Sequence, residues 1–304
     1  MKDPTHLAIR RKAQASALAV ALATALPAAA LPLLGSAQNY VALAGSTITN
    51  TGLSAIWGDI GTDPGIAITG LAGVTHTGTI HQIDATAHQA QFDAAAAYGL
   101  LAARSSTVNL TGVDLGGRTL TPGVYTFNTA AQLTGILTLD AGADPNAQFV
   151  FQIGTALTTA TGSAVNVQNG GARVGVFWQV GSSATLGTGT SFAGNLLADQ
   201  SITLDTAASI LCGRAFALHA ALTLDGNRIS NDCSGAGSLG SGRLDGGSHG
   251  FSAAVPEPTT AALLAFGLAA LARIGGRNLR GHATHNAHPD AASAGPVAKA
   301  LPGS

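Results

Sequence analysis

The feature that most constrains this chain is an internal repeat with hardly any charge. Residues 151–165 (FQIGTALTTATGSAV) align with residues 178–192 (WQVGSSATLGTGTSF) at an offset of 27 residues, and Gln, Gly and Thr recur at matching positions. Related phrases begin at Thr203 (TLDTAAS) and at Thr223 (TLDG). Repeats of β-branched and apolar residues, with Gly or Asp at the corners, are typical of the turns of a solenoid.

We therefore expect a mainly β fold, a right-handed β-solenoid of triangular cross-section whose turns stack about 4.8 Å apart. The residues predicted to fill its interior alternate along the strands: Phe149, Phe151, Ile153, Val176, Trp178 and Val180. Residues 81–104 are rich in Ala and predict one long helix along the coil. Its predicted apolar stripe consists of Ile83, Ala87, Ala90, Ala94, Ala97 and Leu101.

Charge is scarce, because only 10% of the residues are charged, whereas 46% are hydrophobic. The Lys residues are Lys2, Lys12 and Lys299, and Glu257 is the single Glu, so the middle of the chain has neither residue type. The formal net charge is −1. A nucleic-acid partner is not expected, since such binding needs a basic face.

The N-terminal 30 residues predict a signal peptide. Arg10, Arg11 and Lys12 precede a short apolar run that ends in small residues suited to signal peptidase. Cleavage is predicted after Ala30, with Ala37 as the second choice. The predicted exported domain then spans residues 31–233. That length suffices for a substantial core.

The C-terminal region resembles a PEP-CTERM sorting signal. Pro256, Glu257 and Pro258 precede an apolar segment and three arginines, within residues 255–280. The resemblance implies recognition and cleavage by an exosortase-type enzyme at the surface of a Gram-negative bacterium. Any membrane contact is expected through this apolar segment alone. Residues 234–254 are predicted to be a Gly/Ser-rich linker and residues 281–304 a disordered tail.

Two cysteines, Cys212 and Cys233, lie near the end of the predicted domain. Export favours a disulfide between them. A zinc site is less favoured, because a closed site needs four ligands.

Four phrases of the body resemble the microbial ice-binding protein family. They are residues 40–65 (YVALAGSTITNTGLSAIWGDIGTDPG), 114–127 (DLGGRTLTPGVYTF), 137–154 (LTLDAGADPNAQFVFQIG) and 177–198 (FWQVGSSATLGTGTSFAGNLLA). The resemblance implies a discontinuous solenoid, in which the two ends of the domain interleave along one coil beside a helix. It also implies adsorption to ice or ordered water through one flat face, which restrains ice growth or recrystallisation, without a cofactor.

Threonine is the residue type expected on that face. A stacked Thr column presents hydroxyls at the strand spacing of about 4.8 Å, and β-branching keeps the side chains stiff. One exposed column is predicted from Thr158, Thr185, Thr203 and Thr223, and a second from Thr161, Thr188 and Thr206. Thr190 is also predicted to contact ice. Residues three apart, such as Thr185 and Thr188, point to opposite faces of a regular strand, so either a corner separates the columns or one faces inward.

Two other functions remain open, a β-helix enzyme acting on polysaccharide and a surface adhesin or matrix protein without ice activity. An enzyme would need paired carboxylates, and the repeats align Asp205 with Asp225. We expect no enzyme, because Asp beside Gly, Pro or Asn is typical of turns. His81 and His88 would share a helix face. A metal site is not expected, because no third ligand follows them.

Overall fold

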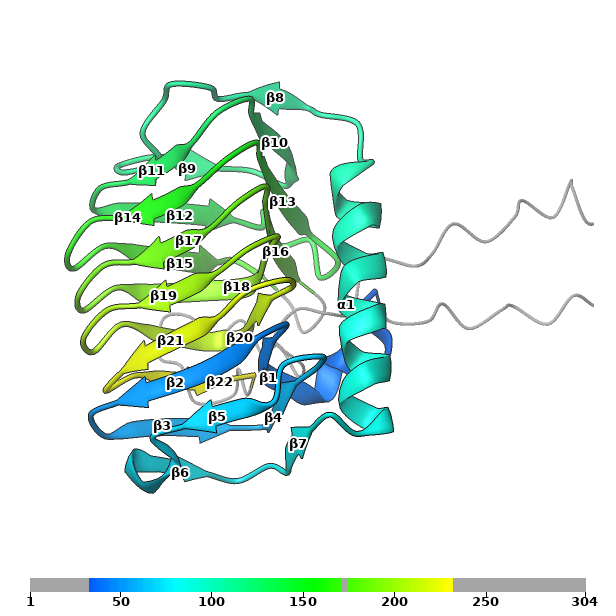
Figure 1. Cartoon of the computed structure of the whole chain (residues 1–304). Coiled ribbons are helices and arrows are strands. Elements are labelled where there is room, and N and C mark those ends of the chain that lie inside the picture. Colours follow the sequence, from blue (N-terminus) through cyan, green and yellow to red (C-terminus); the bar gives the residue numbers. More distant parts are fainter. Residues whose placement is uncertain (1–32, 171–173, 232–304) are drawn as a thin grey trace, which may run out of the picture. The chain divides into compact units, whose positions relative to one another are not determined.

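A computed structural model describes residues 33–170 and 174–231, and these residues form a coil of parallel strands with one long helix (Figure 1). The predicted signal peptide (1–30), linker (234–254), sorting segment (255–280) and tail (281–304) lie outside the described residues. Pro256, Glu257 and Pro258 therefore also lie outside them. Within the described ranges, no helix is long and apolar enough to cross a membrane.

The N-terminal part of the coil precedes the helix. Its elements are η1 (Gly35–Asn39), β1 (Tyr40–Ala44), β2 (Thr47–Thr51), β3 (Ser54–Trp57), β4 (Asp59–Thr62), β5 (Ala67–Thr69), η2 (Leu71–Gly73), β6 (Val74–His76) and β7 (Ile80–Gln82). The helix α1 (Ala85–Ala102) then runs alongside the coil to its other end (Figure 1).

The rest of the coil returns toward the N-terminal turns. Its first strands are β8 (Val108–Asn109), β9 (Thr119–Leu120), β10 (Gly123–Phe127), β11 (Ala131–Leu133), β12 (Ile136–Asp140), β13 (Gln148–Ile153), β14 (Leu157–Thr159) and β15 (Ala164–Gln168). The later ones are β16 (Gly175–Val180), β17 (Ala184–Leu186), β18 (Ser191–Ala198), β19 (Ile202–Leu204), β20 (Ser209–Ala217), β21 (Leu222–Asp225) and β22 (Arg228–Ser230).

Each regular turn has three strands, one on each side of the coil. For example, β14, β15 and β16 pair in parallel with β11, β12 and β13 of the preceding turn. One side is a separate seven-stranded sheet in the order β11-β14-β17-β19-β21-β2-β5. The other two sides belong to a fifteen-stranded sheet, because β18 and β20 are long enough to pair on both.

The predicted discontinuity of the coil is confirmed. Strands β1, β2 and β3 from the start of the chain pair in parallel with β20, β21 and β22 from its end (Figure 1). We call this junction the seam. It brings segments that are far apart in sequence onto neighbouring rungs of the same sheets.

The interior matches the predicted alternation, since all six predicted core residues are buried. Four aromatic rings line successive turns inside the coil. Phe151 and Trp178 stack with centroids 3.9 Å apart, while Tyr125 and Phe192 extend the stack at 5.5 Å from Phe151 and 4.9 Å from Trp178 respectively. The buried Trp178 indole donates to the Ala193 carbonyl oxygen at 3.1 Å, as a buried N–H requires.

The helix packs its predicted alanine stripe against the coil. Five of the six predicted stripe residues are fully buried: Ala87, Ala90, Ala94, Ala97 and Leu101. The last four of these residues pack in one cluster with Val150, Phe177, Leu197 and Phe216. Alanine allows this close approach, because its side chain adds little bulk between the helix and the strands.

The ends of α1 differ from the prediction in one respect. Ile83 was predicted to join the stripe, but it precedes the helix, has a φ of 51° and is 56% exposed. The helix starts later because Asp84 is its N-cap and accepts from the Ala87 backbone N–H at 2.7 Å. At the other end, the Gln152 amide donates to the carbonyl oxygens of Leu101 and Arg104 at 2.8 and 2.7 Å.

Cys212 lies in β20, where it is fully buried and disulfide-bonded. Cys233 lies outside the described residues. The pairing of these two cysteines therefore stays a prediction.

Candidate functional site

The seven-stranded sheet carries one continuous threonine column. Thr158, Thr185, Thr203 and Thr223 are register partners on β14, β17, β19 and β21. Each stands between inward-facing residues that are buried, so its side chain points out of the coil. The four residues predicted as one column from the sequence therefore lie on one face of one sheet.

The column continues across the seam into strands that the repeats did not identify. Thr223 is the register partner of Thr49 in β2, and Thr49 is the partner of Thr69 in β5. Six threonines thus follow one another on adjacent strands, and Gln132 in β11 precedes Thr158. We call these six residues the strand column.

Small residues flank the strand column on one side. Backbone hydrogen bonds align Ala156, Ser183, Ser201 and Ala221 on successive turns. The hydroxyl groups of Ser201 and Ser183 are bonded at 2.9 Å. Ala and Ser are uncharged and smaller than Thr, so the threonine side chains project beyond these neighbours.

A second column follows the adjacent corner of the coil. Backbone bonds run from Gly162 N to the Thr188 carbonyl oxygen at 2.9 Å and from Gly189 N to the Thr206 carbonyl oxygen at 3.0 Å. Thr161, which precedes Gly162, begins this series, and it is exposed together with Thr188 and Thr206. A corner therefore separates the two predicted threonine columns, which is the first of the two arrangements left open by the sequence.

The corner column also continues across the seam, with one change of residue type. Ala207 N bonds to the Asp225 carbonyl oxygen, and Gly226 N bonds to the Thr51 carbonyl oxygen, both at 3.0 Å. Three residues separate Leu224 from Arg228, whereas four separate their register partners Leu204 and Ser209, so Asp225 takes the corner position. The corner column is therefore Thr161, Thr188, Thr206, Asp225 and Thr51.

The prediction that Thr190 contacts ice is wrong. Its relative exposure is 0%, and its hydroxyl is bonded to the Thr159 hydroxyl at 2.7 Å. Gly189 has a φ of 68°, a left-handed conformation that turns the next residue back into the coil. Thr190 therefore belongs to the interior of the corner.

The two aspartates considered for an enzyme, Asp205 and Asp225, lie in turns, and the Asp225 carboxylate bonds to threonine hydroxyls there. Asp225 accepts a hydrogen bond from the Thr206 hydroxyl, and its other oxygen lies 3.1 Å from the Thr51 hydroxyl. The backbone carbonyl of Asp205 accepts from the Asn227 amide at 2.8 Å. These contacts are those of corner residues.

The histidines do not share a helix face as predicted. His81 lies in β7 and bonds to Asp84 at 2.6 Å, whereas His88 lies in α1 and bonds to Asp63 at 2.9 Å. Each imidazole thus has its own carboxylate partner. In the described part of the chain, no three His, Cys, Asp or Glu side chains gather as metal ligands.

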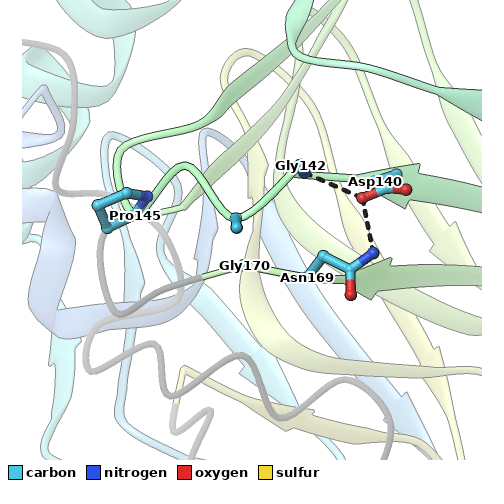
Figure 2. A pocket seen from close by; sticks show the side chains of 6 residues that line it. Asp140, Gly142, Pro145, Asn169 and Gly170 are labelled. Carbon is cyan, nitrogen blue, oxygen red and sulfur yellow. Dashed lines mark hydrogen bonds between the residues drawn. The ribbon is translucent and has the colours of Figure 1, made fainter.

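A hollow lies at another corner of the coil, beside the ends of β12 and β15 (Figure 2). Asp140 accepts from the Asn169 amide and from Gly142 N, both at 2.9 Å, and Gly170 and Pro145 complete the rim. The Asn169 bond, and then the Gly142 bond, lowers the pKa of Asp140. Because the carboxylate serves the turn, the hollow offers little chemistry to a ligand.

The fold and the surface define a class of protein, a discontinuous parallel β-solenoid with one threonine-covered side. The model of the ice-binding-like family matches residues 42–230, and the chain belongs to this family. A PEP-CTERM protein-sorting motif matches residues 254–280, which indicates an exported protein.

Known proteins resemble the chain over most of the described region. An ice-binding protein from Nostoc sp. (strain HG1) is 54% identical over 210 residues, which cover 69% of this chain and 78% of that protein. The crystal structure of an ice-binding protein from an Antarctic biological consortium has a TM-score of 0.62 at 42% identity, covering 67% and 93% of the two chains. That of the ascomycete Antarctomyces psychrotrophicus also has a TM-score of 0.62, at 39% identity and 65% and 96% coverage.

Proposed function

We propose that this chain binds ice through the seven-stranded side of its coil and thereby restrains ice growth or recrystallisation. The observation that carries the proposal is the strand column, six threonines in register on adjacent parallel strands. The names of the similar proteins, which are ice-binding proteins, support it.

The spacing of the hydroxyls gives a physical reason. Strands in one sheet lie about 4.8 Å apart, and residues two apart along a strand are separated by about 6.7 Å. Both distances are close to the scale of ordered water, so the hydroxyls can anchor first-shell waters while the methyl groups limit where other waters settle. A charge would orient those waters differently.

Rigidity lets many weak contacts act together. Threonine is stiff at χ1, and each member of the strand column stands on a hydrogen-bonded strand. The array is therefore ordered before it meets ice, and little conformational entropy is lost on adsorption. The proposed contact residues are the strand column together with Thr161, Thr188, Thr206 and Thr51 at the corner.

The export signal suggests where the protein acts. We propose that residues 31–233 form the ice-binding domain, which a Gram-negative cell exports with signal peptidase and an exosortase-type enzyme and then displays at its surface or in its extracellular matrix. The sorting motif supports this placement. An adhesin or matrix role without ice activity is the alternative that the same motif favours.

Paired substitutions test the function. The double variant Thr185→Tyr with Thr203→Tyr should lower recrystallisation inhibition about tenfold or more, because it lifts the flat array off the ice. Thr138→Tyr is a matched control, since Thr138 is an outward residue of β12 on a different side of the coil. Ice shaping by the parent and the control, but not by the folded double variant, is the expected result. A parent that neither shapes nor adsorbs to ice would remove the proposal and favour the adhesin.

A further inference from the structure

The strand column crosses the seam between β21 and β2. Four of its threonines lie on one side, and Thr49 and Thr69 lie on the other. The two groups come from opposite ends of the domain, so no short loop holds them together. They can act as one array only if the two parts of the coil keep their register at the seam.

Asp225 connects the two parts on the surface. It occupies the corner column between Thr206 and Thr51, as the backbone bonds place it. One carboxylate oxygen accepts from the Thr206 hydroxyl, and the other lies 3.1 Å from the Thr51 hydroxyl, which is also 3.2 Å from the Leu224 carbonyl oxygen. Hydrogen bonds to an ionised acceptor are stronger than neutral ones. Asp225 thus engages one threonine on each side of its rung.

Asn227 makes the same connection inside the corner, where its relative exposure is 0%. Its amide nitrogen donates to the carbonyl oxygens of Asp205 and Ala208 on the preceding turn, at 2.8 and 2.9 Å. Its amide oxygen accepts from Asp225 N at 2.6 Å. The side chain therefore fixes Asp225 relative to the turn before it.

Further buried bonds join Asn227 to the N-terminal turns. Asn227 N donates to the Ser54 hydroxyl at 2.9 Å, and that hydroxyl donates to the Asn50 side-chain oxygen at 2.6 Å. The Asn50 amide nitrogen in turn donates to the Gly70 carbonyl oxygen at 3.2 Å, in the following turn. A chain of polar contacts thus runs behind the corner through four successive turns.

We propose that Asp225 and Asn227 form a seam clamp, a pair of positioning residues that holds Thr49 and Thr69 in register with the rest of the strand column. The proposal rests on the ice-binding function proposed above. The clamp sets the length of the continuous array, and without it the array divides into a group of four threonines and a group of two. Adsorption through many simultaneous contacts weakens when the array divides.

The corner that lies away from the proposed ice face supplies a matched control. There the Asp140 carboxylate accepts a hydrogen bond from the Asn169 amide of the neighbouring turn at 2.9 Å, so this carboxylate also joins two turns (Figure 2). Asp140→Ala therefore removes a similar surface bond between turns of the coil. It leaves the strand column and the corner column unchanged.

A double-mutant cycle on the full chain tests the clamp. Asp225→Ala should weaken recrystallisation inhibition about fivefold, because supporting contacts set the geometry of a binding array. Thr49→Tyr should weaken it similarly in the parent, but less than about twofold further in the Asp225→Ala background, where Thr49 no longer acts with the larger group. With Asp140→Ala, the effect of Thr49→Tyr should remain complete.

Several outcomes would overturn the clamp. Parent-like activity of a folded Asp225→Ala chain would do so, as would full additivity of its effect with that of Thr49→Tyr. Circular dichroism and the melting temperature report on folding. If Asp225→Ala does not fold, Asp225→Asn replaces it, because asparagine keeps one acceptor oxygen. This variant should lose part of the recrystallisation inhibition, and its effect should again not add to that of Thr49→Tyr. Additive effects would contradict the proposal. A parent without ice activity would overturn both the proposed function and the clamp. With an active parent, the variants test the clamp alone.

Discussion

Thr49 and Thr223 are register partners on adjacent parallel strands, although β2 lies before the helix α1 and β21 lies near the end of the described residues. Their pairing makes the N-terminal turns part of the threonine-covered side. It also explains why this side is longer than the local repeats indicate.

The first prediction concerns Thr49, which lies outside those repeats. Thr49→Tyr should reduce thermal hysteresis as strongly as Thr185→Tyr does, because both residues occupy interior positions of one column. The two single variants should agree within about twofold, as expected for equivalent members of one array. An effect of Thr49→Tyr no larger than that of the Thr138→Tyr control would confine the ice face to the C-terminal turns.

A second prediction lengthens the strand column. Gln132 is exposed and is the register partner of Thr158, at the end of the sheet. Gln132→Thr adds a seventh hydroxyl and removes a flexible side chain, so recrystallisation inhibition should improve by about twofold, in keeping with multivalent adsorption. Ice grain growth in dilution series of the purified variant and the parent measures this. Unchanged activity would indicate that adsorption does not use the β11 end of the sheet.

Substitutions of Thr190 and Thr188 should distinguish a threonine of the interior from one at the exposed corner. Thr190→Val removes a buried hydroxyl that bonds to Thr159, so the free energy of unfolding should fall by about 1 kcal/mol. Its ice activity below the melting temperature should match that of the parent. Thr188→Val, at the exposed corner, should change the free energy of unfolding by less than about 0.5 kcal/mol. A loss of ice activity in Thr190→Val without any loss of stability would contradict the interior assignment.

Asp93 predicts a pH dependence of stability. Burial raises the pKa of Asp93, but hydrogen bonds lower it by more, so the net shift is downward. The donors are the Ser36 hydroxyl and backbone N–H, each 2.7 Å from the carboxylate, and the Gln89 side-chain amide. A depressed pKa stabilises the fold above the unfolded value near 3.8, and this contribution is lost as the pH falls through the folded value.

Substitution of Asp93 tests this contribution. Asp93→Ala should lower the free energy of unfolding by about 1–2 kcal/mol at pH 7, because it removes hydrogen bonds to a charged acceptor. The difference from the parent should shrink below about pH 4, where the carboxyl becomes protonated in the unfolded chain. Urea unfolding at several pH values measures it. A difference that stays constant down to pH 2 would argue against an ionised Asp93 as the link between η1 and α1.

Local periodicity predicted most of the fold. The offset of 27 residues aligns Thr158 with Thr185, and the structure pairs them in register. The helix was visible in its alanine spacing, because a stripe that packs closely on strands needs small residues. The alternation around Phe151 and Trp178 likewise predicted their burial.

Two kinds of information were missing from the local pattern. Along the strand column, Thr49 and Thr69 follow Thr223, although they come earlier in the chain. A comparison of neighbouring repeats does not detect this order, even though TNTG at residues 49–52 resembles TLDG at residues 223–226. The left-handed turn at Gly189 was the second, since it reverses the side on which Thr190 lies. Backbone geometry at corners, rather than residue type, decides which hydroxyls face out.

The most direct test of the account is adsorption to a single ice crystal. Fluorescently labelled parent chain, its Thr185→Tyr, Thr203→Tyr variant and the Thr138→Tyr control are each presented to a slowly growing ice hemisphere, and fluorescence in the ice is compared with that in the liquid. The account predicts that the parent and the control are incorporated at the ice surface and that the folded double variant is excluded. Exclusion of the parent, or equal incorporation of the double variant, would contradict the assignment of the threonine column as an ice-binding surface.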